Sequence, residues 1–203
     1  MFLDIEDRIE SQGTFDLFKL LFPILVVLGL AQLTPVSDFF VWDRSLIQQG
    51  EIWRLITGNF THTNLPHLMM NATALTVFCF IFKDILNPKK LWLLLFSISL
   101  LTGSFLLLSA MQSYVGLSGV LHGLFIWAAI EDIKQQRNTG WLLLIGVLAK
   151  IAWEQYFGAS TSTISLINAK VATEAHLIGA LSGGMLQLVN YILMFNKASD
   201  VPK

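Results

Sequence analysis

Six apolar runs dominate the chain, and short polar connections separate them. The runs cover residues 17–33, 65–82, 91–110, 116–130, 141–157 and 172–195. Hydrophobic residues make up 54% of the 203 residues, charged residues make up only 13%, and the mean hydropathy is +0.63. A helix needs about 20 mostly apolar residues to cross a bilayer, and only helices or closed barrels pair their backbone groups in lipid. The pattern therefore predicts an all-α fold, a polytopic membrane bundle of six transmembrane helices.

The same runs predict the domain organisation. Residues 1–16 are polar and mostly acidic, so we expect a short cytoplasmic N-terminal segment, followed by one domain over 17–195 and a cytoplasmic tail over 196–203. The first run lacks a basic n-region and a cleavage pattern, which favours a retained helix over a signal peptide. The connection over 34–63 is long and rich in aromatic residues. This composition favours a segment folded at the membrane interface over a slack linker.

Lysine and arginine are distributed unequally between the two sides of the predicted bundle. If six helices alternate, one side carries Arg8, Lys19, Lys83, Lys89, Lys90, Lys134, Arg137, Lys197 and Lys203, and the other carries only Arg44, Arg54 and Lys170. Basic residues favour the cytoplasmic side, so we expect both termini in the cytoplasm and the second, fourth and sixth helices to begin at the outer face. A net charge of −1 offers no basic surface for nucleic acid, which leaves membrane lipid as the surroundings.

Polar side chains gather near the outer starts of those three helices. His67 and Asn71 begin the second helix, Ser118 and His122 the fourth, and His176 the sixth. At a rise of 1.5 Å per residue they share one level, about 10 Å below the outer surface. Ionisable groups inside spans are costly and indicate function. The fourth run is also too short to span, so its entry loop is expected to line a wet cavity.

Ser118 is the candidate nucleophile. Gly116 and Gly119 flank it, which permits a sharp turn and close approach of another helix. With His176 as the base, the pair predicts acyl transfer at a peptide carbonyl. The sequence shows no acidic residue at this level to orient the histidine, so we expect a Ser–His dyad in which His122 or the backbone holds the ring.

Two further groups of residues support this interpretation. The candidate donors to the oxyanion are backbone N–H groups at Leu117 and Ser118 together with His67 and Asn71, which lie four residues apart on one helical face. Ala175, Gly179 and Gly183 form a row of small residues beside His176. Such rows let membrane helices pack closely, and this row would bring the histidine to the serine.

Taken together, these motifs resemble those of the rhomboid family of intramembrane serine proteases. The matching features are Gly-x-Ser-Gly at 116–119, His-xxx-Asn at 67–71 preceded by His62, Ala-His-xx-Gly-xxx-Gly at 175–183, and Trp53-Arg54 in the first loop. The resemblance implies a six-helix fold, no cofactor and no metal, a dyad of Ser118 and His176, oxyanion donors at His67 and Asn71, and cleavage of transmembrane protein substrates near their outer ends.

One departure from the family pattern refines the resemblance. Many rhomboids carry a tyrosine four residues after the serine, stacked on the catalytic histidine, whereas this chain has His122. That version is similar to the rhombosortase branch, which removes a GlyGly-CTERM sorting tail from exported proteins in Gram-negative bacteria. The resemblance implies an inner membrane location and a site that opens to the periplasm. It leaves open whether His122 orients His176 or shares its proton, and whether water or another amine resolves the acyl-enzyme.

The same residues admit a metal site and two other functions. Four histidines could ligate a metal, namely His62, His67, His122 and His176, but no His-Glu-x-x-His motif is present. A general rhomboid protease of unrelated single-pass substrates and a rhomboid-like protein that binds helices without cutting them are the alternative functions.

The sequence indicates structural roles for several charged and aromatic residues. Lys150 and Glu154 are expected to form a partly snorkelling pair on the fifth helix. Glu174 is expected to be an interfacial charge facing away from the site, and Trp53 and Arg54 are expected to anchor and rigidify the first loop.

Overall fold

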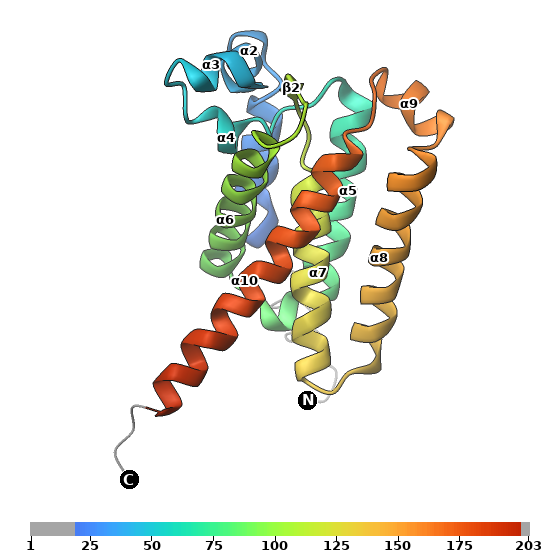
Figure 1. The fold of residues 1–203 in the computed structure, drawn as a ribbon. Helices are drawn as coiled ribbons and strands as arrows, with labels where there is room; N and C mark the ends of the chain where they lie inside the picture. The colour runs from blue at the N-terminus through green and yellow to red at the C-terminus, as the bar shows by residue number, and fades with distance from the viewer. Residues whose placement is uncertain (1–18, 200–203) are drawn as a thin grey trace, which may run out of the picture.

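The computed structural model describes residues 19–199, which form a bundle of long helices joined by short helices and strands (Figure 1). The long helices are Lys19–Leu30, α5 Leu65–Ile81, α6 Pro88–Leu106, α7 Ser118–Lys134, α8 Asn138–Phe157 and α10 Thr173–Ser199. The short elements are α2 Thr34–Phe40, β1 Trp42–Asp43, α3 Arg44–Gln48, α4 Arg54–Thr57, η1 Lys83–Ile85, β2 Ser113–Tyr114 and α9 Thr161–Ile167. The all-helical bundle confirms the predicted fold class.

Length and composition mark several of these helices as candidate membrane spans. Helices α6 and α10 qualify alone, and two bent pairs, Lys19–Leu30 with α2 and α8 with α9, bring the total to four among the described residues. Large apolar side chains project from the long helices, such as Leu93 (61% exposed), Leu142 (74%) and Phe195 (66%). Exposed apolar faces of this extent are expected where lipid replaces water as the surrounding solvent.

The connection over 34–63 is folded, as its aromatic content predicted. Its elements α2, α3 and α4 lie together at the top of the bundle in Figure 1. The Arg54 guanidinium is only 4% exposed and donates to the Asp38 and Val41 carbonyls at 3.0 and 2.7 Å and to Glu51 at 2.6 Å. Arg54 thus links several parts of this connection by hydrogen bonds, but its side chain is buried within the connection and does not lie at the surface, as an interfacial anchor would.

Arg44 joins the connection over 34–63, called the outer layer below, to the end of α6. Its guanidinium donates to four carbonyls that follow or end the helix, those of Leu106, Leu107, Ser109 and Met111, at 2.8 to 3.0 Å. The last carbonyls of a helix have no intrahelical partner, and a cation there also suits the helix dipole. The outer layer is therefore fixed to the bundle through hydrogen bonds that α6 needs in any case.

The structure adds elements that the sequence did not predict, namely the antiparallel pair of β1 with β2, the short helix η1 and helix α9, and it leaves parts of the domain prediction outside its range. Helix α9 follows α8 after Gly158, whose φ is +79°, and the two helices are bent by 88°. The predicted N-terminal segment 1–16 and residues 200–203 of the predicted tail lie outside the described residues, while α10 continues to Ser199.

Small residues let α7 and α10 pack backbone against backbone. An ideal Cβ built on Gly179 would lie 1.9 Å from the Gly119 carbonyl oxygen, and one built on Gly183 would lie 2.0 Å from that of Gly123. Ala175 contributes the next contact, because a Cβ on Gly119 would meet its carbonyl oxygen at 2.8 Å. The predicted close approach of the fourth and sixth long helices is present, and only glycine permits it at these positions.

We predict that Gly179→Ala lowers the melting temperature of the detergent-solubilised protein. The added methyl group must push α10 away from α7, and overpacking of this kind costs about 1–3 kcal/mol. The matched control is Gly29→Ala on the first helix, where no atom lies within 4 Å of the new Cβ. That variant should melt at or above the wild-type temperature. Equal melting of the two variants in a thermal scan would contradict the packing argument.

Candidate active site

Ser118 is the first residue of α7, and the turn before it depends on Gly116. Gly116 has φ +121°, a conformation that residues with a Cβ rarely adopt. A Cβ there would also lie 2.8 Å from Nε2 of His67, and the Tyr114 hydroxyl donates to the Gly116 carbonyl. The sharp turn places the Ser118 hydroxyl at the start of a helix, where the first N–H groups have no intrahelical acceptor.

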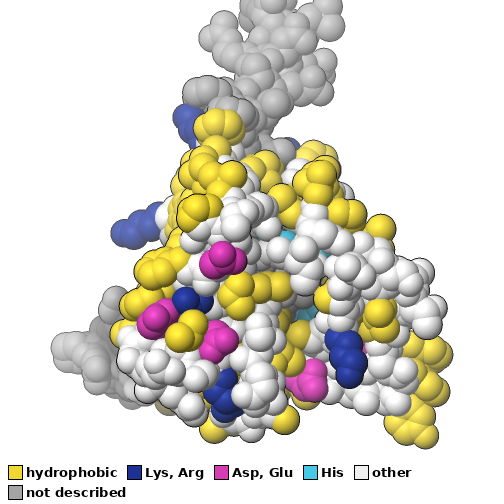
Figure 2. All heavy atoms as spheres, turned by 90° about the horizontal axis from the view of Figure 1, so that it is seen from above, with side chains coloured by type: hydrophobic (Ala, Val, Ile, Leu, Met, Phe, Trp, Pro, Cys, Tyr) yellow, Lys and Arg dark blue, Asp and Glu magenta, His cyan; other side chains and the backbone are white. Residues whose placement is uncertain are grey.

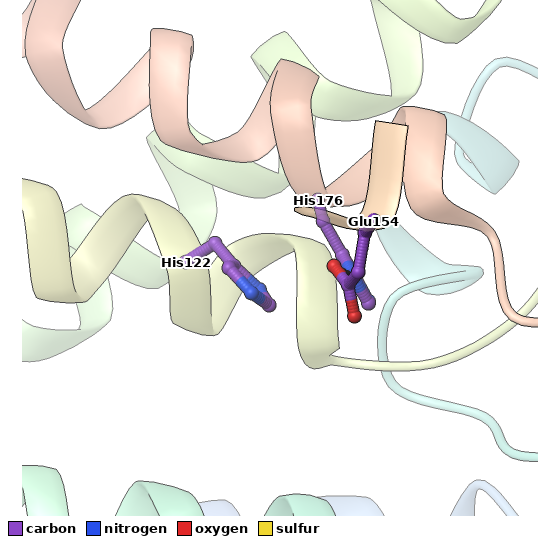
Figure 3. A group of neighbouring side chains, drawn as sticks. All are labelled: His122, Glu154 and His176. Carbon is purple, nitrogen blue, oxygen red and sulfur yellow. Dashed lines mark hydrogen bonds and ion pairs between the residues drawn. The ribbon is translucent and has the colours of Figure 1, made fainter. Parts of the chain in front are cut away.

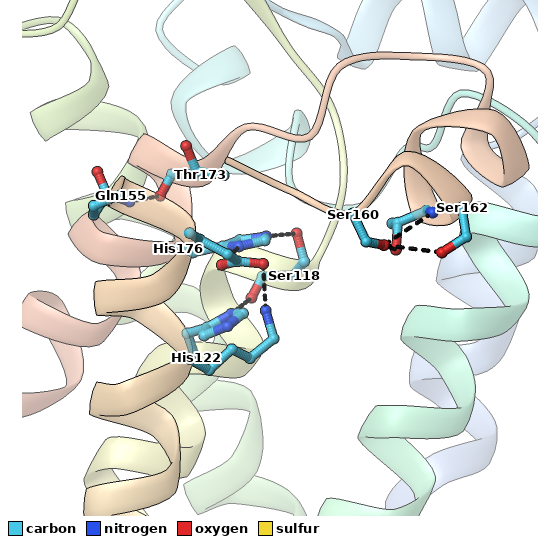
Figure 4. A network of polar contacts seen from close by, with 10 residues as sticks. Ser118, His122, Gln155, Ser160, Ser162, Thr173 and His176 are labelled. Atoms are coloured by element: carbon cyan, nitrogen blue, oxygen red, sulfur yellow. Dashed lines mark hydrogen bonds and ion pairs between the residues drawn. The ribbon is translucent and has the colours of Figure 1, made fainter. Parts of the chain in front are cut away.

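His176 reaches Ser118 from α10. Its Nε2 lies 2.8 Å from Ser118 Oγ, within hydrogen-bond distance, and the histidine is 4% exposed (Figure 4). The sequence predicted this pair from residues 58 positions apart. The structure brings the two together because His176 directly follows Ala175, whose carbonyl lies against Gly119 in the α7–α10 contact.

The expectation that no acidic side chain orients His176 is wrong. Glu154 of α8, drawn in Figure 3, places Oε2 2.7 Å from His176 Nδ1. Its other carboxylate oxygen accepts a hydrogen bond from Lys150. A signal was present in the sequence. Glu154 lies three residues before the outer end of α8, so the same count of helical rise would have placed it near the level of the serine and histidine. Glu174, in contrast, is exposed, but it also lines a cavity that touches Ser118, so it does not face fully away from the site.

His122 covers one face of the catalytic imidazole. Its ring centroid is 4.2 Å from that of His176 and the two planes differ by 18°, which is a stacked arrangement. Its Nδ1 lies 2.7 Å from the Ser118 carbonyl oxygen four residues earlier, so this nitrogen carries the proton and donates. The hydrogen bond fixes the ring of His122 in the position from which it supports His176.

The two predicted side-chain donors to the oxyanion, His67 and Asn71, line the same cavity as the serine. The two residues belong to α5 and are 8% and 5% exposed. His67 Nδ1 lies 3.1 Å from the Thr63 hydroxyl. The Asn71 Nδ2 group is buried and has no hydrogen-bond partner among the described residues. A buried donor without a partner is costly unless a ligand satisfies it.

Leu117 does not fit the role predicted for it. Its N–H donates to Nε2 of His62, at a long distance of 3.5 Å, and so is directed at this ring. His62 packs edge-on against His67, and its backbone N–H donates to Oε1 of Gln32 at 3.1 Å. Burial, reinforced by repulsion from His67, lowers the pKa of His62 to about 3. A neutral His62 therefore supports the turn before Ser118 and brings no charge to the site.

A cavity of about 710 Å³ opens beside the serine between α5 and α8. Its polar lining residues are His67, Asn71, Ser118, His122, Lys150, Glu154, Ser160, Thr163 and His176. Elsewhere the lining is mainly apolar, with Leu142, Leu143, Val147 and Trp153 contributed by α8. A second cavity of about 540 Å³ also touches Ser118 and is lined by residues of the outer connections, such as Ser113 and Lys170. Histidine side chains are visible in the view from above in Figure 2.

This geometry agrees with two comparisons with known proteins. The rhomboid domain model matches residues 49–192. The chain belongs to the rhomboid family. It is also 24% identical over 196 residues to a protein of Bacillus subtilis (strain 168) described as "Putative rhomboid protease YdcA", a match that covers 86% of this chain and 92% of that protein. The chain is thus a multi-pass membrane protein of the intramembrane protease family, whose substrates are membrane proteins.

The residues that could hold a metal ion in the structure of this rhomboid are not the four histidines that the sequence offers. Among the described residues, His122, Glu154 and His176 hold ligand atoms within 4.8 Å of one another, while His62 and His67 are not in that group. Both ring nitrogens of His176 already take part in hydrogen bonds, to Ser118 and Glu154. A proton-transfer arrangement accounts for the cluster by itself.

We predict that Asn71→Ala slows acylation of Ser118 by a fluorophosphonate probe about 10- to 1000-fold, as losses of single oxyanion donors do. The melting temperature should not fall, because the Nδ2 group has no hydrogen bond to lose. Thr76→Val is the matched control on α5, since that hydroxyl bonds only to its own helix at Ala72 and does not line the cavity. Equal labelling rates for the wild type and Asn71→Ala would show that the Asn71 amide is not an oxyanion donor.

Proposed function

We propose that this rhomboid is a serine endopeptidase that cleaves transmembrane proteins near the outer face of the membrane. The observation that carries the proposal is the 2.8 Å contact between Ser118 Oγ and His176 Nε2, inside a helical bundle and beside a cavity. A hydroxyl in hydrogen-bond contact with an imidazole is the arrangement of an activated nucleophile.

The chemistry follows the acyl-transfer scheme of serine proteases. Ser118 Oγ attacks the carbonyl carbon of the scissile peptide bond while its proton passes to His176 Nε2. The tetrahedral intermediate then collapses, the C–N bond breaks, and the imidazolium returns the proton to the leaving amine. Water attacks the resulting ester by the same route in reverse, which releases the new carboxyl terminus and frees Ser118.

The developing oxyanion would be met by the Ser118 N–H at the start of α7 and by the side chains of His67 and Asn71. Helix N-termini favour negative charge, and donors fixed in place before the reaction stabilise the transition state without reorganising. The partnerless Nδ2 of Asn71 supports this assignment, because a substrate oxygen would satisfy it.

The two cavities suggest separate routes for substrate and water. The apolar cavity between α5 and α8 suits a peptide segment that leaves the lipid, since its walls are mainly aliphatic and aromatic. The cavity beneath the outer connections is the proposed path for the hydrolytic water. Both reach Ser118, so neither reactant has to cross the site of the other.

For the substrate, we propose a C-terminal transmembrane sorting tail of the GlyGly-CTERM type on exported proteins, as in rhombosortases. His122, in place of the tyrosine found in many rhomboids, supports this choice because it stacks on His176 and so forms part of the catalytic environment. The distribution of lysine and arginine supports cytoplasmic termini in a bacterial inner membrane and a site that opens to the periplasm.

We predict that Ser118→Ala and His176→Ala each abolish cleavage and leave the bundle folded. The assay is cleavage of a reporter fused to a transmembrane tail with Gly-Gly at its outer border, in proteoliposomes, with mass spectrometry of the new C-terminus. The Thr76→Val variant serves as the active control. Full activity of either purified alanine variant would refute the mechanism, and loss of wild-type activity on chelation would favour a metal hydrolase.

We predict that His122→Tyr reduces cleavage of the Gly-Gly reporter more than cleavage of a reporter whose tail lacks Gly-Gly. Tyrosine can stack on His176 but cannot donate to the Ser118 carbonyl in the same way as the imidazole of His122. The ratio of kcat/KM values for the two reporters is the measurement. An unchanged ratio would show that His122 has no part in tail selection.

A further inference from the structure

We propose that Glu154 is a positioning residue of the catalytic unit, which makes the unit a Ser118–His176–Glu154 triad rather than a dyad. This inference rests on the proposed serine protease function and adds a residue from a third helix to it. Ser118 comes from α7, His176 from α10 and Glu154 from α8.

The contact has the geometry and burial that such a role needs. Glu154 Oε2 lies 2.7 Å from His176 Nδ1, and the two side chains are 10% and 5% exposed. Hydrogen bonds to an ionised group are stronger than neutral ones, and low exposure limits competition from water. Lys150, one turn earlier on α8, donates to the other oxygen of the carboxylate. Figure 3 shows the carboxylate of Glu154 beside the His176 ring.

The tautomer of His176 explains why a carboxylate is useful there. Nε2 must be free of its proton to accept the one from Ser118, so Nδ1 carries the N–H in the resting enzyme and needs an acceptor. The carboxylate of Glu154 accepts this hydrogen bond and stabilises the imidazolium that forms during attack.

His122 does not compete for this role. It lies against the face of the His176 ring and not at its Nδ1 edge, and its own Nδ1 donates to the Ser118 carbonyl. The ring of His176 is thus supported on one face by α7 and at one edge by α8. These contacts divide the orienting function between two residues with different chemistry.

The test measures how fast Ser118 reacts with a fluorophosphonate probe as a function of pH, using the full chain in detergent. We expect Glu154→Gln to slow labelling at least about 100-fold, as loss of the third member does in other triads. The charged or titratable groups that face His176 are Glu154 and Lys150 from α8, His122 from α7 and His67 from α5. Removing the only anion among them should move the half-maximal rate to lower pH.

The neighbouring residue offers a matched control. Gln155 Nε2 donates to the Thr173 carbonyl at 2.9 Å, so it also connects α8 to α10 but does not touch the catalytic side chains (Figure 4). Gln155→Ala should label at the wild-type rate with an unchanged pH profile. If Gln155→Ala and Glu154→Gln slow labelling equally and leave the pH profile in place, the carboxylate serves only to hold the helices together.

A second variant covers the case in which Glu154→Gln misfolds. Glu154→Ala leaves a space that opens on the 710 Å³ cavity, so added formate can reach it. We expect formate, but not formamide, to raise the labelling rate of Glu154→Ala several-fold. Wild-type rates for Glu154→Gln, or the absence of formate rescue, would overturn the triad while leaving the dyad intact. Absence of probe at Ser118 in the wild type would overturn both proposals.

Discussion

The backbone contact between α7 and α10 is the constraint on which the site depends. Side chains at Gly119 and Gly179 would hold the two helices apart, and the hydroxyl of Ser118 would then lie beyond the reach of His176. A membrane bundle gains no hydrophobic free energy from contact between its helices, so close van der Waals packing between small residues has to supply the stability. The packing that holds the bundle together is also the packing that assembles the nucleophile and base.

Polar groups inside such a bundle are costly unless they have partners. The cost is met here by a continuous chain of hydrogen bonds that runs from Lys150 through Glu154 and His176 to Ser118. Five buried side-chain atoms lack a hydrogen-bond partner among the described residues, and they belong to Asn59, Asn71, Ser99, Thr102 and Trp127. Of these residues only Asn71 lines the cavity where the substrate is proposed to bind.

The outer layer gives this arrangement its rigidity. Arg44 and Arg54 each satisfy several backbone carbonyls of connections that would otherwise hold unpaired groups near the membrane. The connection before α7 is likewise fixed by Tyr114 and by the neutral His62. Glycine residues provide the sharp turns, but arginine, tyrosine and histidine side chains hold those turns in one conformation.

The sequence by itself determined the helices, because apolar runs and their polar starts depend only on local composition. It also placed Ser118 and His176 at one depth, since helical rise is fixed. The sequence did not predict the contact of Glu154 with His176, because the pairing of Glu154 with Lys150 already explains that carboxylate locally. It also did not predict the direction of the Leu117 N–H, which depends on the turn before α7. Tertiary structure alone decided which side chains meet, because the rotation and separation of packed helices depend on contacts such as that of Gly119 with Gly179, made between residues far apart in the chain.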